Sequence, residues 1–285
     1  MAIFGSATPV SKIVTSAMPV FIGSLLRVSL GALVLAPFAL RRRKELGQIT
    51  RRDWLLICII ALFGMFGFST LMLYGMRMVT GVTGAIVMST TPALTAAASM
   101  IFLRESASWR KLAAIALAVS GVLILQLNSE DDGGNNSFIG ATIVLAAVCC
   151  EVVYTLVGKK LTEAIDPVLV AFLAAALSIP LFVPFAVWQV WDFDVSQVDT
   201  GSWIAVIWYG AGTLALGSWL WYSGIAQTQG SVAAVYMGVM PASALILSYV
   251  LLGEDFRVTD LAGFAVVFAG VILVSIEHYK MGRKV

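Results

Sequence analysis

The sequence predicts an all-α membrane protein with ten transmembrane helices, arranged as two five-helix repeats of inverted topology. The chain has a mean hydropathy of +0.94 and only 12% charged residues, whereas soluble domains carry about 25%. Apolar runs of roughly 20 residues recur along its whole length, and its two halves resemble each other. Because the runs are continuous rather than alternating, they favour helices over the strands of a barrel.

The apolar runs between polar breaks define the expected spans. They cover approximately residues 1–16, 20–40, 54–77, 82–104, 109–127, 138–161, 168–191, 203–226, 231–252 and 258–277. Only 11 residues precede Lys12, whereas 22 residues run from Phe138 to the residue before Lys160 in the equivalent span. The first helix is therefore about half a span short, and half a span would leave backbone groups unsatisfied in lipid. We expect the numbered chain to lack the start of this helix, the alternative being a helix that crosses only partly.

The distribution of Lys and Arg predicts the orientation of the chain in the membrane. Fourteen of the eighteen basic residues fall on one side, in the loops at 41–52, 104–111 and 159–160 and in the tail at 280–284. The other side has only Lys12, Arg77 and Arg257, and Arg27 lies inside the second span. Both termini are therefore expected in the cytoplasm, with the chain in the cell inner membrane as a multi-pass protein.

Constant offsets relate the two halves of the chain. The repeated pairs are Lys12 with Lys160 and Pro19 with Pro167 at an offset of 148, then Pro92 with Pro241 and Glu105 with Glu254 at an offset of 149. The polar stretch NSEDDGGNNS at 128–137 is the expected linker, so the expected repeats cover residues 1–128 and 138–285. Each half has five spans, and because five is an odd number the second half starts on the opposite side of the membrane and is inverted relative to the first. Inverted repeats are typical of secondary transporters; a bundle duplicated only for packing is the alternative.

Two segments carry a family resemblance. They are TGAIVMSTTPALTAAASMIFLRES at 83–106 and GSVAAVYMGVMPASALILSYVLLGE at 230–254, each with a small-residue start, a mid-helix proline and a terminal acid. With GVLILQL and GVILVSI closing the two halves, the chain resembles the EamA family of the drug/metabolite transporter superfamily over essentially its whole length. The resemblance implies a secondary carrier of the kind that exports amino acids and other small metabolites, without ATP or a cofactor. The sequence contains no GxxxxGK[ST] motif, which would indicate a nucleotide-binding loop.

A narrower resemblance concerns CEVVYTLVGK at 150–159. This segment is similar to the first helix of the small multidrug-resistance exporters, whose glutamate binds protons and cationic substrates alternately. The resemblance implies that role for Glu151, with Thr155 and Lys159 as the matching threonine and lysine. Those exporters present two glutamates per dimer, whereas the position paired with Glu151 here is Ile3. A single acid per chain leaves a two-proton stoichiometry in doubt.

Glu151 is the main candidate for a functional residue, because a charge deep in a membrane span is costly and must face a cavity, be protonated or pair with a base. Tyr154 and Thr155 follow at i+3 and i+4, so the three side chains share one helix face. A substrate ammonium is the expected partner of Glu151, and a substrate carboxylate would need donors such as Tyr and Thr hydroxyls. A structural ion pair or a buried neutral acid is the alternative.

Further candidate residues for substrate binding come from the repeat. Pro92 and Pro241 interrupt equivalent helices and free backbone carbonyls, although a packed kink would explain them equally well. The other candidates are Ser89 and Thr91 beside Pro92, the aromatic pair Tyr74 and Tyr222, and Trp219 with Tyr236. Interfacial anchoring explains the aromatic pair as well, and core packing explains Trp219 and Tyr236.

The expected function is export of small organic solutes, most simply amino acids and related metabolites, by alternating access between inverted halves. A proton-coupled exporter of cationic drugs acting through Glu151 is the alternative. Carriers of phosphorylated sugars need several midplane Lys or Arg residues, and the sequence indicates none. An enzyme is not expected, because one glutamate without a second catalytic group supplies no constellation. The expected partners are a small-molecule substrate, the lipid bilayer and, left open, a proton; we expect a monomer, no metal and no nucleic acid.

Overall fold

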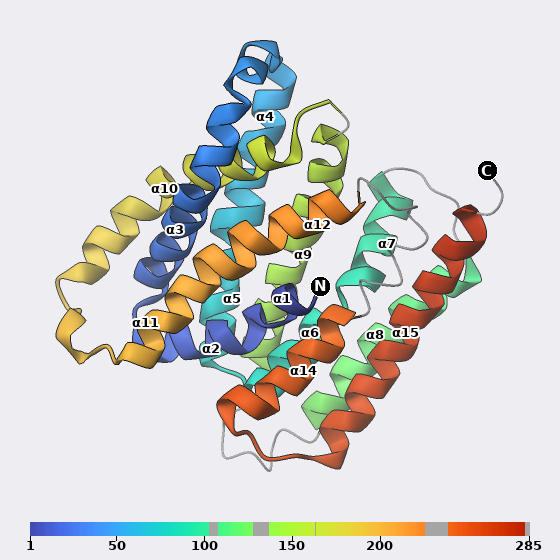
Figure 1. Ribbon diagram of the computed structural model, residues 1–285. Coiled ribbons are helices and arrows are strands. Elements are labelled where there is room, and N and C mark those ends of the chain that lie inside the picture. Colours follow the sequence, from blue (N-terminus) through green and yellow to red (C-terminus); the bar gives the residue numbers. More distant parts are fainter. Residues whose placement is uncertain (103–107, 128–136, 163, 226–238, 283–285) are drawn as a thin grey trace.

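The computed structural model describes residues 1–102, 108–127, 137–162, 164–225 and 239–282. Within these ranges all regular elements are helices, and no strand occurs (Figure 1). Seven helical segments of the described chain are long and apolar enough to cross a membrane: Val20–Arg41, Arg51–Arg77, Gly81–Ala98, Phe138–Leu161, Pro167–Val190, Thr200–Trp221 and Val258–Ile276. The all-helical membrane fold is therefore confirmed, whereas the arrangement of ten spans in two repeats stays a prediction.

The first half of the chain, residues 1–128, contains helices α1 to α8. Their bounds are α1 Ala2–Gly5, α2 Ala7–Ala17, α3 Val20–Arg41, η1 Arg43–Gln48, α4 Arg51–Ile59, η2 Ile60–Gly67, α5 Phe68–Arg77, α6 Gly81–Met88, α7 Thr91–Phe102 and α8 Trp109–Leu127. The expected span at 82–104 is interrupted, because α6 ends before Ser89 and α7 begins at Thr91. Pro92 therefore lies in the first turn of α7, where its missing N–H costs no helical hydrogen bond.

The second half, residues 138–285, contains helices α9 to α15. Their bounds are α9 Phe138–Leu161, α10 Pro167–Val190, η4 Val195–Gln197, α11 Thr200–Ile207, η5 Trp208–Leu216, α12 Gly217–Ile225, α14 Val239–Leu252 and α15 Val258–Gly282. The expected linker at 128–137, apart from Ser137, and Glu105 lie outside the described residues. Side-chain caps begin several helices. Asp199 is the N-cap residue of α11. Hydrogen bonds from the Ser202 hydroxyl and amide lower the pKa of its carboxyl.

Two π-helical segments lie at equivalent places in the two halves. η2 begins at Ile60 and η5 begins at Trp208, which is the offset of 148 found in the sequence. Each is continuous with an α-helix before it and another after it, so each widens one long span near its middle. π-helical turns are rare, and where they occur they are frequently found at functional sites.

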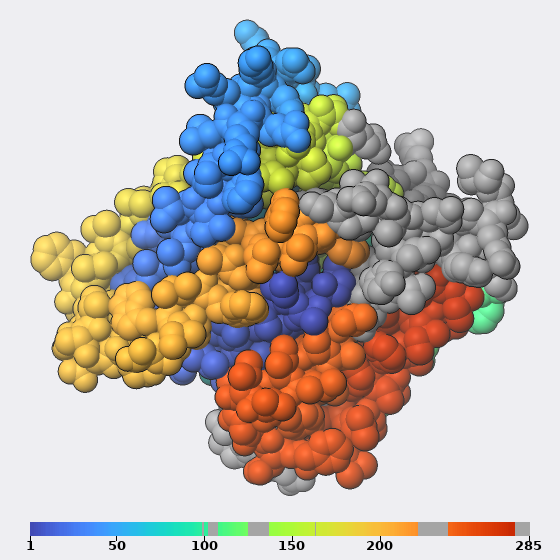
Figure 2. Space-filling view, in the orientation of Figure 1, coloured from blue at the N-terminus to red at the C-terminus, as the bar shows by residue number. Residues whose placement is uncertain are grey.

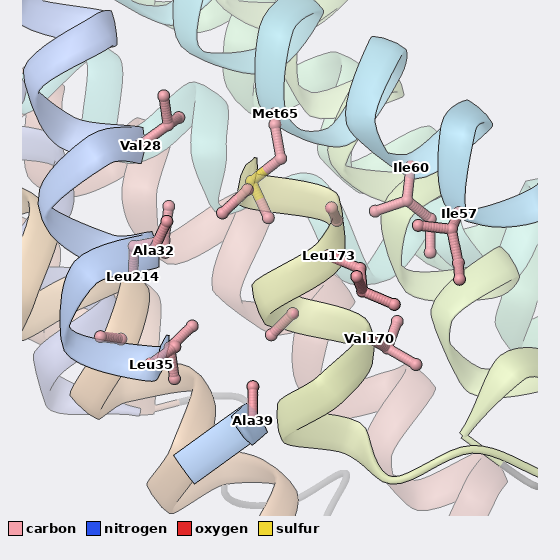
Figure 3. Packing of buried hydrophobic residues seen from close by; sticks show 14 of the residues in the cluster. Val28, Ala32, Leu35, Ala39, Ile57, Ile60, Met65, Val170, Leu173 and Leu214 are labelled. Carbon is pink, nitrogen blue, oxygen red and sulfur yellow. The ribbon is translucent and has the colours of Figure 1, made fainter. Parts of the chain in front are cut away.

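The largest apolar core lies between α3, η2, α10 and η5. Figure 3 shows Val28, Ala32 and Leu35 along one face of α3, at the spacing of a helix stripe, with Val170 and Leu173 of α10 in the same cluster. Many large apolar side chains point outward instead; Leu33, on the same helix, is 70% exposed. An outward apolar surface of this kind is stable only against lipid.

The first helices lie between elements of the second half. Figure 2 shows α1 and α2 between α12 and α14, and α1 packs against α14. At the end of α5, Lys12 Nζ donates hydrogen bonds to the carbonyls of Met76 and Val79, at 2.7 and 2.5 Å. These bonds satisfy carbonyls that a helix end leaves without partners, so Lys12 fastens α2 to α5.

Glu254 joins the two halves at the same end of the molecule. Its carboxylate oxygens accept hydrogen bonds from the amides of Gly81 and Val82, at 2.5 and 2.8 Å. These are the first amides of α6, where the helix dipole favours a negative charge. Glu254, the last residue of the segment 230–254, therefore caps α6 of the first half.

Replacing Glu254 by Ala is expected to destabilise the protein by about 1–3 kcal/mol, because the two buried amides lose their acceptors. The expected result is a lower midpoint of thermal unfolding in detergent micelles. Asp255 is the neighbouring exposed acid, so Asp255→Ala is the matched control. Equal midpoints for the two variants would show that the cap contributes nothing.

Candidate functional site

A cavity of about 90 Å³ lies between residues of the two halves. Its walls come from α1, α2, α3, η2, α5 and α6 of the first half and from α9, η5, α12 and α14 of the second half. At about 30 Å³ for each water, this volume is room for about three water molecules. Both π-helical segments contribute to the walls, through Gly64 and Met65 of η2 and through Tyr209, Thr213 and Leu214 of η5.

Glu151 lines this cavity from α9. The Thr91 hydroxyl lies 3.1 Å from its Oε2 atom and 2.7 Å from the Met88 carbonyl oxygen. One hydroxyl proton serves one acceptor well, whereas a carboxylate offers about four lone pairs. Within the described ranges no Lys or Arg lies within ion-pair distance of Glu151. The carboxylate therefore keeps accepting capacity for a group inside the cavity.

Arg27 lines the same cavity from α3 and is only 8% exposed. Its Nη1 atom donates to the Ser69 hydroxyl at 2.5 Å. Its guanidinium carbon lies 4.4 Å from the ring centre of Tyr209 and 5.3 Å from that of Phe68, which are cation–π distances. In the part of the chain that the structure describes, no carboxylate lies within 4.0 Å of it. A positive and a negative side chain thus share one cavity without pairing.

A close approach of α3 to η5 sets the position of Arg27. A Cβ atom on Gly210 would lie 2.7 Å from the Cβ of Leu30 and 2.8 Å from the Arg27 carbonyl oxygen. Only a residue without a side chain fits here, and small residues at such contacts let membrane helices approach closely. Tyr209 directly precedes Gly210 in the chain, and its ring lies against the guanidinium of Arg27.

Much of the rest of the cavity wall is apolar and adaptable, although Thr8, Thr213 and Ser218 also line it. Four methionines line it: Met65, Met72, Met88 and Met240. Unbranched, polarisable Met side chains fill irregular spaces and suit surfaces that accept several ligands. The cavity therefore combines two charged groups with a wall that tolerates variation in the apolar part of a ligand.

The structure brings together some of the residues predicted from the sequence. Glu151, Tyr154 and Pro241 line the cavity, and Thr91 is hydrogen-bonded to Glu151. Tyr154 lies where η2 comes close to α9, because a Cβ atom on Gly64 would be 2.8 Å from its Cβ. Glu151 and Tyr154 of α9 therefore line one cavity, and a substrate site on this face of α9 stays a prediction.

Other predicted residues lie away from the cavity lining. The Ser89 hydroxyl donates to the Ala85 carbonyl of its own helix at 2.7 Å. Tyr74 packs edge-on against Phe21, and Trp219 is 44% exposed and stacks on Phe38. Pro92 and Thr155 are half-buried and are not lining residues. The backbone of Tyr222 belongs to α12, but its side chain and the whole of Tyr236 lie outside the described residues.

Among the lining residues that were not predicted as site residues, Arg27 and Tyr209 stand out. Arg27 had a signal in the sequence, since an arginine within an apolar span is costly and marks function by default. Tyr209 had no comparable signal, because its place depends on the π-helical turn and on Gly210.

The arrangement suits binding of a small charged solute. A solitary carboxylate can exchange a proton for an ammonium group, and a guanidinium recognises a carboxylate or phosphate. Among the described residues, no group of three or more His, Cys, Asp and Glu that could hold a metal is present. What the walls offer is two opposite charges and an apolar surround.

Comparisons with known proteins agree with this description. The model of the EamA-like transporter family matches residues 1–127 and 138–276. An uncharacterized transporter of Bacillus subtilis (strain 168), YetK, is 32% identical over 279 residues, covering 97% of this chain and 84% of that protein. A probable terminal-alkyne amino-acid exporter of Streptantibioticus cattleyicolor is 25% identical, covering 92% of this chain and 85% of that protein.

A solved crystal structure superposes with a TM-score of 0.66 at 16% identity, over 98% of this chain and 97% of that chain. At this identity the likeness concerns the fold alone. The family match extends over nearly the whole chain, and apolar helices long enough to span a membrane accompany it. The chain therefore belongs to the EamA-like transporter family and is a multi-pass membrane protein.

Proposed function

We propose that this protein is a secondary exporter of amino acids and related small metabolites. The observation that carries the proposal is the cavity between the two halves, with Glu151 on its wall. A carboxylate with spare accepting capacity is a partner for the ammonium group that amino acids share. The volume of about 90 Å³ suits a small solute.

Transport would proceed by alternating access between inverted halves. Elements related by the repeat pack in matched pairs, which supports this architecture: α3 packs against η5, and α10 packs against η2. α8 and α15, which close the two halves, also pack against each other. In Figure 1, α3 rises toward the end where α4 begins, whereas α10 descends from that end. A site between repeats with opposite directions is the arrangement that rocking of the halves requires.

The proposed orientation follows from the basic residues. Arg42 and Asp166 form an ion pair of 3.3 Å, so the basic loop after α3 and the turn after α9 meet at one end of the molecule. We propose that this end faces the cytoplasm, with both termini on the same side and the protein in the inner membrane. The proposed working unit is a monomer, since the cavity is formed within one chain.

Export of cationic solutes in exchange for protons is the second candidate function. The lone acid and the methionine-lined wall favour it, because a carboxylate binds a proton or a cation in turn and methionines accommodate varied apolar groups. Support for amino acids comes from one distant relative, which is described as a probable terminal-alkyne amino-acid exporter. The two candidates differ in whether the solute carries a carboxylate.

A counterflow screen in liposomes distinguishes them. Purified protein is reconstituted with one unlabelled solute inside, and uptake of the same labelled solute from outside is measured. We expect exchange with at least one amino acid, and none in liposomes without protein. Exchange with quaternary cations but with no amino acid would overturn the first proposal in favour of the second.

A further inference from the structure

We propose that Arg27 and Tyr209 form a carboxylate-binding subsite in the cavity that Glu151 also lines, so that the cavity selects zwitterions over the corresponding amines. This inference rests on the proposed function, because it assigns a second pole to the same cavity. Neither Arg27 of α3 nor Tyr209 of η5 was predicted from the sequence as a site residue.

The first observation is an unused donor on Arg27. Its Nη1 atom has the Ser69 hydroxyl as acceptor, but its buried Nε atom has no hydrogen-bond partner in the described structure. A buried donor without an acceptor costs free energy, and a charged donor costs more than a neutral one. Arg27 lines the cavity, so a small shift of its side chain would bring this buried donor to an oxygen of a bound solute.

The second observation is an unused donor on Tyr209. This side chain is only 1% exposed, and within the described ranges its hydroxyl has no partner. Buried tyrosine hydroxyls usually find one. Tyr209 and Arg27 lie on one wall, because the guanidinium stands 4.4 Å from the tyrosine ring. Two residues that line the cavity therefore each carry a buried donor without a partner, and one of these donors is charged.

The charges identify the chemical class of the ligand. A buried guanidinium is stabilised by a directly bound carboxylate, and the fork of an arginine matches one. Glu151 cannot neutralise it directly, since among the described residues the two groups are not within 4.0 Å. A solute with a carboxylate at one end and an ammonium at the other satisfies Arg27, Tyr209 and Glu151 together.

A purely structural role for Arg27 makes a different prediction. The rings of Phe68 and Tyr209 and the Ser69 hydroxyl could hold the guanidinium as part of the packing. Tyr209→Phe keeps the ring and removes only the hydroxyl, so the packing contact survives while the proposed ligand contact is lost. Arg27→Lys keeps the charge and loses the planar fork.

The test compares each amino acid with its decarboxylated amine as competitors in counterflow. The probes are alanine with ethylamine, leucine with 3-methylbutylamine and phenylalanine with 2-phenylethylamine. We expect the wild type to prefer the amino acid, and Tyr209→Phe and Arg27→Lys to weaken amino-acid competition by about 10- to 100-fold. Competition by the amine should change little. Tyr249→Phe, a tyrosine outside the cavity lining, is the control expected to behave as wild type.

The outcomes separate the two proposals. If amino acids exchange but Tyr209→Phe matches wild type, or if both variants weaken acid and amine equally, the subsite is wrong and the exporter proposal stands. If the wild type exchanges none of the amino acids, both proposals are overturned. Thermal unfolding of each variant in detergent identifies loss of fold, and the Tyr209→Phe result decides the question where Arg27→Lys does not fold.

Discussion

Replacing Glu151 by Gln is expected to lower exchange of amino acids by about 10- to 100-fold, the loss typical of one charge-assisted hydrogen bond. Gln has nearly the same shape and can still accept the Thr91 hydroxyl, which lies 3.1 Å from the carboxylate. The variant is therefore expected to fold normally. What it loses is the negative charge that would bind the ammonium group of the substrate.

The pH dependence of exchange gives a second readout for Glu151. A proton and an ammonium group compete for one carboxylate, so wild-type exchange is expected to weaken as the pH falls through the titration of Glu151. In Glu151→Gln there is nothing to titrate at this position, and the profile is expected to be flat. Counterflow with labelled amino acid in liposomes buffered at a series of pH values measures both.

The matched control for this prediction is Asp192→Asn, since Asp192 is an exposed acid in the loop after α10. It is expected to leave both the rate and the pH profile unchanged. Unaltered exchange by Glu151→Gln at every pH would show that Glu151 is a structural residue. In that case the cavity would have to recognise its solute without a negative charge.

Replacing Gly210 by Ala is expected to have the second large effect. The added Cβ would meet the Arg27 carbonyl oxygen at 2.8 Å and the Leu30 Cβ at 2.7 Å, so α3 and η5 must move apart. Overpacking of this kind costs about 1–3 kcal/mol. Because Arg27 belongs to the displaced segment, exchange is expected to fall further than the loss of stability alone would explain.

Thermal unfolding and counterflow on the same preparation check this prediction. Gly47→Ala is the control, because a Cβ on Gly47 has nothing within 4 Å. It is expected to match wild type in both measurements. A Gly210→Ala protein with a wild-type unfolding midpoint and wild-type exchange would mean that the approach of α3 to η5 is not required for the site.

The sequence by itself determined the helical membrane fold and most helix ends. Apolar run lengths and polar breaks are local properties, so the expected spans at 20–40 and 138–161 correspond to α3 Val20–Arg41 and α9 Phe138–Leu161. The sequence also singled out Glu151, because a lone acid in an apolar helix is conspicuous without knowledge of its neighbours. Tyr154, at i+3, followed from helix geometry and lines the cavity.

Only the tertiary structure decided which distant residues share the cavity with Glu151. Arg27, Tyr209 and Glu151 come from three helices far apart in the chain, and no periodicity relates them. Their meeting depends on a π-helical turn in η5 and on a glycine contact with α3. Such features arise from packing between helices, which the pattern along a single helix does not encode. For the same reason Trp219, chosen from the sequence for its aromatic ring, turned out to be exposed.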